Sequence, residues 1–174
     1  RATTSSADTT DLDHDAEMGE KSGWERVSYY RSHAALGDPD KRPRGWAGEL
    51  WSPAIEAEHR ATRETVGLFD ESSFAKIEVS GAGAPAFLEW MCDNRVARGA
   101  GRVTYTQLLN ARGGVEADLT VSQLGPESFQ LVTGTAFGGH DLAWLRRHAP
   151  RDGSVVVRDV TSAWTCFGLW GPRA

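Results

Sequence analysis

Two carboxylates, Glu116 and Asp118, lie in a stretch that alternates between apolar and polar residues over positions 115–122. Such alternation is typical of a strand with one face toward a core, and it places Asp118 on the other face. A carboxylate there either is solvated or lines a pocket, because Asp is rarely buried without a partner. In a pocket it could take up a proton or stabilise a developing positive charge. The pattern alone leaves both alternatives open.

A predicted β-hairpin positions this carboxylate. Residues 102–109 form its first strand, and the alternating stretch forms its second strand. The turn between them contains Asn110, Arg112, Gly113 and Gly114. Asn and Gly tolerate the positive φ values that tight hairpins require, so the turn chemistry supports the prediction.

The segments around the hairpin switch between helical and extended patterns. Ser52 and Pro53 suit the N-cap and the first position of a helix, and Gly67 suits its end. We expect strands at 68–70, 74–80, 129–133, 155–160 and 164–170, and further helices at 84–92 and 139–149. This order predicts the α+β class, with a largely antiparallel sheet and covering helices.

The composition of the 174 residues is typical of a globular protein, with 40% hydrophobic and 25% charged residues. The net charge of −5 gives no general basic surface for nucleic acid or an anionic membrane. No apolar run reaches the length of about 18 residues that predicts a transmembrane helix. We therefore expect neither nucleic acid nor a membrane as a partner.

The two cysteines, Cys92 and Cys166, are far apart in the sequence and lie among apolar residues. Their spacing does not fit a zinc site, and we expect no metal. We interpret both as buried free thiols, with a disulfide between them as the open alternative. Free thiols fit a cytoplasmic location.

Three regions differ in composition. Residues 1–22 have too little apolar surface to offset the entropy of ordering, and they predict a disordered acidic tail. Residues 23–48 join a short aromatic patch to a stretch rich in Pro, Gly and charge, and they predict a connector. Residues 49–174 carry the patterns of a folded domain. Because the chain does not start with Met and ends directly after a predicted strand, we expect it to be the first part of a longer domain.

Six motifs make residues 45–173 resemble a known family. They are VGLFD (66–70), FAKIEVSG (74–81), YTQLLN (105–110), GGVEADLTV (113–121), HDLAWLRRH (140–148) and GLWGPR (168–173). Their order and spacing resemble the folate-binding domain of the aminomethyltransferase family. That family includes the glycine cleavage T-protein and the C-terminal part of dimethylglycine and sarcosine dehydrogenases.

The resemblance implies tetrahydrofolate as the cofactor and assigns roles to individual residues. Asp118 would lie against the reactive part of the pterin and act as the catalytic carboxylate. Tyr105 would pack on the folate, and Val132, Thr133 and Gly134 would form the neighbouring wall. The one-carbon donor would be a methylated amine or a glycine-derived group.

One departure from the T-protein pattern favours the dehydrogenases within this family. Ala117 precedes Asp118, whereas the T-protein has an acid there, and the dehydrogenases are closer to this sequence. The resemblance therefore favours a tetrahydrofolate-binding, aminomethyl-transfer domain of a dimethylglycine or sarcosine dehydrogenase-like flavoenzyme, which captures the oxidised carbon as methylenetetrahydrofolate.

The chain has no GxGxxG motif after a strand, so FAD is expected only in a flavin domain outside this chain, in the same full-length protein or complex. The later glutamate and arginine of the family are also missing, and we expect this chain alone to be inactive. Two alternatives stay open. One is a stand-alone aminomethyltransferase of the glycine cleavage type, and the other is a non-catalytic binding module derived from this domain.

Overall fold

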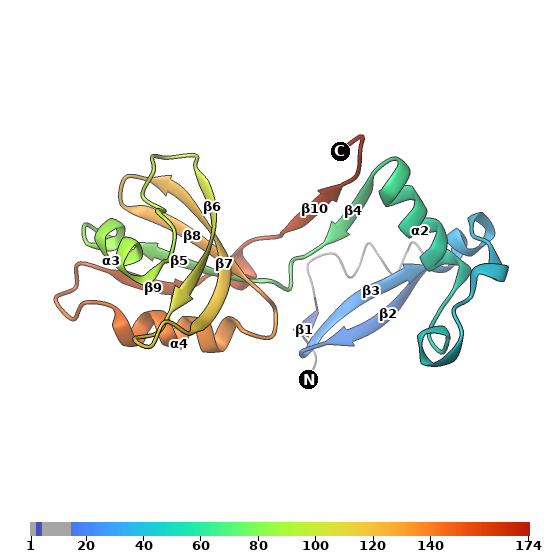
Figure 1. Ribbon diagram of the computed structural model, residues 1–174, viewed down its shortest axis with the longest axis horizontal. Helices are drawn as coiled ribbons and strands as arrows, with labels where there is room; N and C mark the ends of the chain where they lie inside the picture. Colours follow the sequence, from blue (N-terminus) through green and yellow to red (C-terminus); the bar gives the residue numbers. More distant parts are fainter. Residues whose placement is uncertain (1–2, 5–14) are drawn as a thin grey trace. The chain divides into compact units, whose positions relative to one another are not determined.

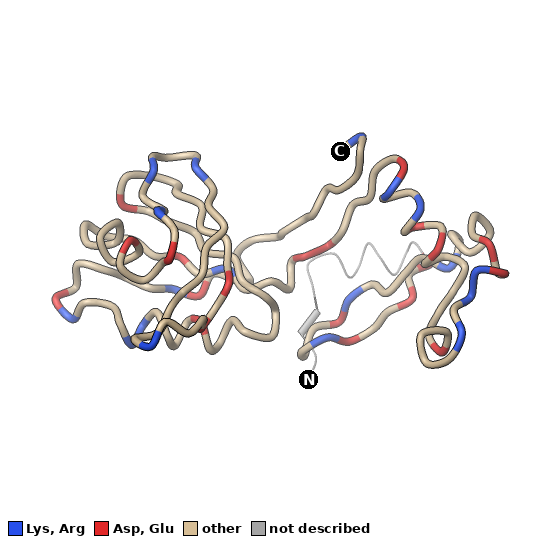
Figure 2. The backbone as a smooth tube through the Cα atoms, in the orientation of Figure 1, with Lys and Arg blue, Asp and Glu red and all other residues tan. Residues whose placement is uncertain are grey.

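The computed structural model describes residues 3, 4 and 15–174, and it divides into two compact units (Figure 1). The first unit contains Arg1–Ser73 and Thr165–Ala174, and the second contains Phe74–Trp164. Acidic and basic residues are spread along the backbone of both units (Figure 2). No helix within residues 15–174 combines the length and the apolar character needed to cross a bilayer.

A fully antiparallel sheet forms the body of the second unit. Across the sheet, the strands follow the order β6 (Val103–Leu109), β7 (Val115–Gly125), β8 (Ser128–Thr133), β5 (Ala75–Ser80) and β9 (Val156–Asp159). Two helices accompany it, α3 (Ala84–Met91) and α4 (Gly138–His148). The predicted α+β class, with an antiparallel sheet and covering helices, is confirmed.

One hydrophobic core holds the second unit together. Leu119 and Val121 of β7 alternate into this core, as the sequence pattern predicts, and Phe129 and Leu131 of β8 join them. Helix α3 contributes several apolar side chains and α4 contributes Leu145 to the same cluster. Both helices therefore lie on one face of the sheet. The opposite face, which carries Asp118, is covered by neither of these two helices.

The first unit combines a hairpin, a helix and a two-stranded ribbon. Strands β2 (Ala16–Lys21) and β3 (Trp24–Tyr30) pair antiparallel around a turn at Ser22 and Gly23, and β1 (Thr3–Thr4) pairs parallel with β3. Strands β4 (Gly67–Asp70) and β10 (Phe167–Trp170) form the ribbon. The remaining elements are α2 (Pro53–Glu64) and the 3-10 turns η1 (Arg31–Leu36), η2 (Pro39–Lys41) and η3 (Gly45–Gly48), with η4 (Thr161–Ala163) in the second unit.

Helix α2 begins as its sequence predicts. The Ser52 hydroxyl accepts a hydrogen bond from the Ala54 amide at 3.2 Å, and Pro53 takes the first helical position, where no amide hydrogen is needed. Two of its small side chains, Ala54 and Ala57, are buried.

The predicted disordered tail is wrong for residues 16–21, which form β2; residues 1, 2 and 5–14 lie outside the described residues. Composition missed this strand because its stability comes from main-chain pairing with β3 and not from its own apolar content. Arg31 also binds Glu17 at 2.5 Å and fixes the base of the hairpin. The expected boundaries at residues 22 and 48 do not coincide with the division into units.

Both cysteines are free thiols, which confirms that part of the prediction. Cys92 is buried, and burial raises the pKa of its thiol to about 12. Cys166 is half-buried in the first unit.

Candidate functional site

The candidate site lies on the open face of the sheet in the second unit, where Tyr105 and Asp118 meet. In the ladder, Tyr105 pairs with Thr120 and Gln107 pairs with Asp118, so the contact is diagonal between neighbouring strands. The Tyr105 hydroxyl donates a hydrogen bond of 2.7 Å to Oδ2 of Asp118. The hairpin predicted from the sequence thus brings together the two residues to which the resemblance assigns the main roles.

The electrostatics of this pair follow from the shared hydrogen bond. The hydrogen bond that the Tyr105 phenol donates to the Asp118 carboxylate raises the pKa of the phenol above its ordinary value. Partial desolvation and the negative charge of the carboxylate raise it further. Tyr105 remains 61% exposed and Asp118 is also exposed. Within residues 15–174, no hydrogen bond or ion pair occupies the second carboxylate oxygen, Oδ1. The pair therefore offers an oriented acceptor beside an accessible flat ring.

The predicted wall residues divide between the two faces of the sheet. Val132 pairs with Thr120 and shares the face of Asp118. Gly134 directly follows β8, and continuing the register places it opposite Asp118. Thr133 points the other way: it is buried, and its hydroxyl donates a 2.6 Å hydrogen bond to Asp141. The geometry accordingly supports Val132 and Gly134 as neighbours of the pair, whereas the Thr133 side chain belongs to the interior.

A polar chain that the sequence prediction did not include links α4 to the hairpin. Asp141, in the first turn of α4, is 1% exposed, and its second oxygen contacts Nδ1 of His140 at 2.9 Å. Nε2 of His140 lies 3.7 Å from Glu116, which also accepts a 2.8 Å hydrogen bond from the Asn110 amide. These contacts fix the turn end of the hairpin to the start of α4. The sequence signal that could have indicated this polar chain is the adjacent pair of titratable residues, His140 and Asp141, in the first turn of α4.

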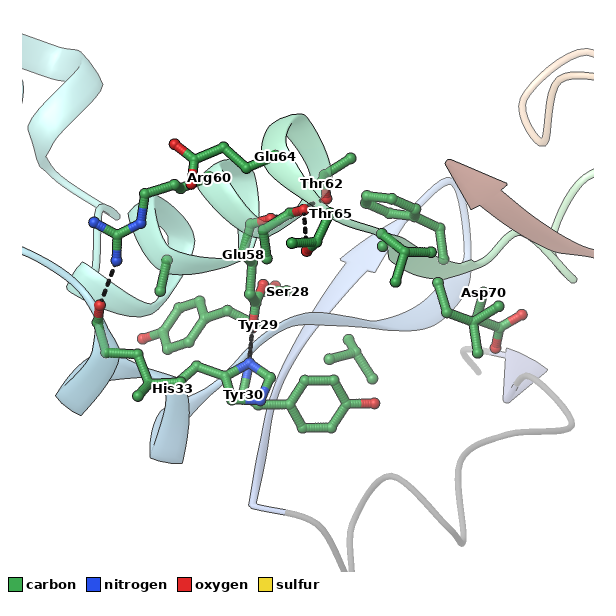
Figure 3. Close-up of a pocket in the computed structure, with 18 of the residues that line it drawn as sticks. Ser28, Tyr29, Tyr30, His33, Glu58, Arg60, Thr62, Glu64, Thr65 and Asp70 are labelled. Atoms are coloured by element: carbon green, nitrogen blue, oxygen red, sulfur yellow. Dashed lines mark hydrogen bonds and ion pairs between the residues drawn. The ribbon is translucent and has the colours of Figure 1, made fainter. Parts of the chain in front are cut away.

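A cavity of about 640 Å³ lies within the first unit, and the sequence prediction did not identify it. Figure 3 shows His33 and Tyr30 below α2, with the Glu58 side chain reaching down to them. Oε1 of Glu58 contacts Nδ1 of His33 at 2.8 Å and accepts the Tyr30 amide hydrogen at 3.0 Å. Exposed apolar side chains, Leu68 and Phe167 among them, line its other end. The Glu58 contacts tether β3 and η1 to α2.

Within residues 15–174, no group of three or more His, Cys, Asp or Glu side chains is arranged to hold a metal ion. The contacts of the acidic and histidine side chains near the candidate site are hydrogen bonds and ion pairs within the protein.

Comparison with known proteins identifies the family. A family model described as the GCVT N-terminal domain matches residues 8–174. The chain belongs to the GCVT N-terminal domain family. Membership extends over both units and confirms the resemblance to aminomethyltransferases that the motifs indicate.

Curated relatives fall into several named groups. The aminomethyltransferase of Geobacillus thermodenitrificans is 37% identical over 75% of this chain, and dimethylglycine dehydrogenase of Rattus norvegicus is 30% identical over 94% of it. The pyruvate dehydrogenase phosphatase regulatory subunit of Mus musculus is 31% identical over 91%. The chain spans 35%, 19% and 18% of the lengths of these three proteins, respectively.

A solved structure agrees with the fold. The aminomethyltransferase T of the glycine cleavage system from Bartonella henselae superposes with a TM-score of 0.78 at 25% identity. The match covers 99% of this chain and 42% of that protein. The chain is thus an aminomethyltransferase-type domain that is also related to dimethylglycine dehydrogenase.

Proposed function

We propose that this chain binds tetrahydrofolate on the open face of its sheet and serves one-carbon transfer within a dimethylglycine or sarcosine dehydrogenase-like flavoenzyme. The observation that carries the proposal is the Tyr105–Asp118 pair, in a chain of this family, with one carboxylate oxygen oriented by the phenol and the other without a protein partner among the described residues.

The residues present suit a reduced pterin. The exposed ring of Tyr105 gives a flat apolar surface on which a flat heterocycle can stack. The unpaired oxygen of Asp118 is a charged acceptor for an N–H group, and such hydrogen bonds are stronger than neutral ones. Val132 adds an apolar contact on the same face. The donor and acceptor set of the site therefore fits the cofactor.

Asp118 would perform the proton chemistry. Tetrahydrofolate, when bound, supplies the amine nitrogen that takes up a carbon at the oxidation level of formaldehyde. The Asp118 carboxylate can accept the proton that this nitrogen loses as the new bond forms. Its negative charge also stabilises positive charge on the carbon donor, and this effect grows where water is excluded.

Tyr105 would hold the carboxylate in place. Because its hydroxyl donates to Oδ2, it fixes the rotation of the Asp118 side chain and directs Oδ1 away from the phenol. The phenol is protonated at neutral pH, since its pKa lies above the ordinary value, and it is therefore a donor. This orientation is available before a ligand binds, which lowers the entropy lost on binding.

The larger assembly is part of the proposal. Since the chain spans about a fifth of dimethylglycine dehydrogenase, amine oxidation would take place on FAD in a separate flavin domain. The carbon released there would be captured at Asp118 as methylenetetrahydrofolate, and the free thiols favour a reducing, cytoplasmic setting.

A non-catalytic binding module is the second candidate, because one of the relatives is named a regulatory subunit. The decisive comparison uses the flavoenzyme that carries this sequence, supplied with sarcosine or dimethylglycine and tetrahydrofolate. The proposal expects methylenetetrahydrofolate to form at the expense of free formaldehyde. Formaldehyde that accumulates equally with and without tetrahydrofolate would reject one-carbon capture and favour the binding module.

Binding can be tested on the chain itself. We expect tetrahydrofolate to cause weak, saturable shifts in the NMR signals of Tyr105, Thr120 and Val132. Tyr105→Ala should abolish them, and Tyr29→Ala, in the first unit, should not. Shifts that are absent from these three residues, or unaffected by Tyr105→Ala, would move the folate site away from this face.

A further inference from the structure

The cavity in the first unit has the size and the lining of a small-molecule site. Its volume of about 640 Å³ is typical of ligand pockets, which are mostly apolar and carry a few polar groups at fixed places. Residues of β3, η1, α2, β4 and β10 line it, and all of the lining residues belong to the first unit. The Tyr105–Asp118 site lies in the second unit, so the function proposed above leaves this cavity unassigned.

One end of the cavity presents hydrogen-bond acceptors. Oε1 of Glu58 contacts Nδ1 of His33 and the Tyr30 amide, as Figure 3 shows, whereas Oε2 has no hydrogen bond or ion pair within residues 15–174. A neutral imidazole that donates through Nδ1 presents Nε2 as a second acceptor. Both positions suit a group that donates hydrogen bonds, and a carboxylate oxygen binds a charged donor more strongly than a neutral one.

Aromatic rings make up much of the remaining lining. They belong to Tyr29, Tyr30, Phe69 and Phe167. The centroid of the Tyr30 ring lies 5.4 Å from that of His33, which contacts the Glu58 carboxylate. The face of an aromatic ring attracts a cation that lies within about 6 Å of its centroid. Phe69 and Phe167 are 44% and 53% exposed, so a ligand in the cavity would also remove apolar surface from water.

The two arginines of the lining already bind protein acceptors. Nη2 of Arg60 donates to the Leu36 carbonyl at 2.6 Å, and its Nη1 lies 3.5 Å from Glu56. Nη2 of Arg26 donates to the Asp70 carbonyl at 3.2 Å. The lining carries three carboxylate side chains and two guanidinium groups, so apart from its histidine it has a net negative charge. This charge favours a cation over an anion in the cavity.

We propose that the cavity of the first unit binds an organic cation, namely a protonated amine that carries an apolar group. The ammonium group donates to Oε2 of Glu58, and the aromatic rings attract its positive charge. The apolar group lies against Leu68 and Phe167. The proposal uses residues of the first unit alone and does not depend on the folate site.

Three probes of similar shape and different charge test the proposal. They are N,N-dimethylbenzylamine in its protonated form, isobutylbenzene, in which a carbon replaces the nitrogen, and phenylacetate, which is an anion. Each is titrated into the 174-residue chain at neutral pH and followed by the NMR signals of Tyr30, Glu58 and Phe69. We expect the amine to bind saturably and at least about tenfold more tightly than isobutylbenzene, because a charged hydrogen bond contributes about that much. Phenylacetate should not bind.

Two variants test the carboxylate and the rings separately. Glu58→Gln keeps the length of the side chain and removes its charge, so it should weaken amine binding about tenfold and leave isobutylbenzene unaffected. Phe69→Leu keeps an apolar side chain and removes the ring, so it should weaken amine binding about threefold. Because Phe69→Leu leaves the Glu58 contacts intact, it tests the site even if Glu58→Gln fails to fold.

The control variant is Glu49→Gln. Glu49 is an exposed glutamate of the same unit outside the cavity lining, so the control removes the same charge. It should bind all three probes as the wild type does. Circular dichroism reports whether each variant is folded.

Several results would overturn the proposal. Equal affinities for the amine and isobutylbenzene would make the cavity an apolar site without charge selection. Equal losses of amine binding in Glu58→Gln and Glu49→Gln would assign the preference to the general charge of the chain. Tighter binding of phenylacetate would show an anion site, and an absence of saturable shifts with the amine would reject the site altogether.

Discussion

The hydrogen bond between Tyr105 and Asp118 changes how the phenol titrates. Because the pKa of Tyr105 in the folded chain lies above its unfolded value, the neutral phenol stabilises the fold fully below pH about 10. That contribution is lost as the pH rises through the folded value. An ultraviolet or ¹³C NMR titration should find the Tyr105 phenol ionising above its ordinary pKa. Asp118→Asn should lower the pKa of Tyr105 toward its ordinary value; an unchanged value would show that the carboxylate does not hold the phenol.

For single residues, the sequence predicts the face of a strand on which a side chain lies better than it predicts which side chains contact one another. The alternation that begins at Val115 correctly places Asp118 and Leu119 on opposite faces of the strand, because successive side chains on a strand point to alternate faces. The bond to Tyr105 depends on the register of two strands, which alternation within one strand does not determine. Thr133 was assigned to the wall by resemblance, although the alternation of Phe129 and Leu131 already predicts that it points inward.

Strand β7 carries both the core and the candidate site, and two neighbouring residues test its register. Leu119 is 2% exposed in the core, so Leu119→Ala should cost about 2–5 kcal/mol in the free energy of unfolding. Thr120→Ala, on the open face, should cost less than about 1 kcal/mol. Denaturant melts measure both values. Equal losses would mean that the face assignments, and the placement of Asp118 with them, are wrong.

Helix α2 is attached to the first unit through Glu58, which accepts hydrogen bonds from two groups of a neighbouring segment. Glu58→Ala leaves the Tyr30 amide without this partner and should lower the stability of the first unit by about 1 kcal/mol. Glu64→Ala, an exposed residue of the same helix, serves as the control and should have little effect. A thermal melt in which both variants match the wild type would show that the Glu58 contacts contribute nothing.

Element types were predictable because caps and periodicity are local signals. Ser52 and Pro53 mark the start of α2, and the turn residues mark the β6–β7 hairpin. Strand β2 was missed because its pairing with β3 supplies the hydrogen bonds that its composition does not suggest. The cavity in the first unit was not predictable either, since its lining comes from segments far apart in the sequence.

The second unit contains its own complete core, since all members of the hydrophobic cluster lie between Ile77 and Val157. A chain of residues 74–164 should therefore fold alone. Its amide NMR spectrum should be dispersed, with the long-range contacts of the antiparallel sheet, and its melt should be cooperative. A collapsed spectrum without those contacts would show that the second unit depends on the first for its stability.

The central claim is that the Asp118 carboxylate acts in one-carbon transfer. Asp118→Asn keeps the size of the side chain and removes its charge and its proton affinity. In the flavoenzyme that carries this sequence, it should lower the rate of methylenetetrahydrofolate formation by about 10²–10⁴. Amine oxidation at the flavin should continue, so free formaldehyde should accumulate. Folate affinity should change much less, because the contacts of Tyr105 and Val132 remain.

The measurement is the ratio of methylenetetrahydrofolate to free formaldehyde in wild type, Asp118→Asn and Asp93→Asn. Asp93 is an exposed aspartate of the same unit and controls for the loss of one negative charge. We predict that the ratio falls in Asp118→Asn alone. An unchanged ratio in Asp118→Asn, with folate bound as in the wild type, would contradict the account and leave Asp118 a solvated carboxylate on an open sheet.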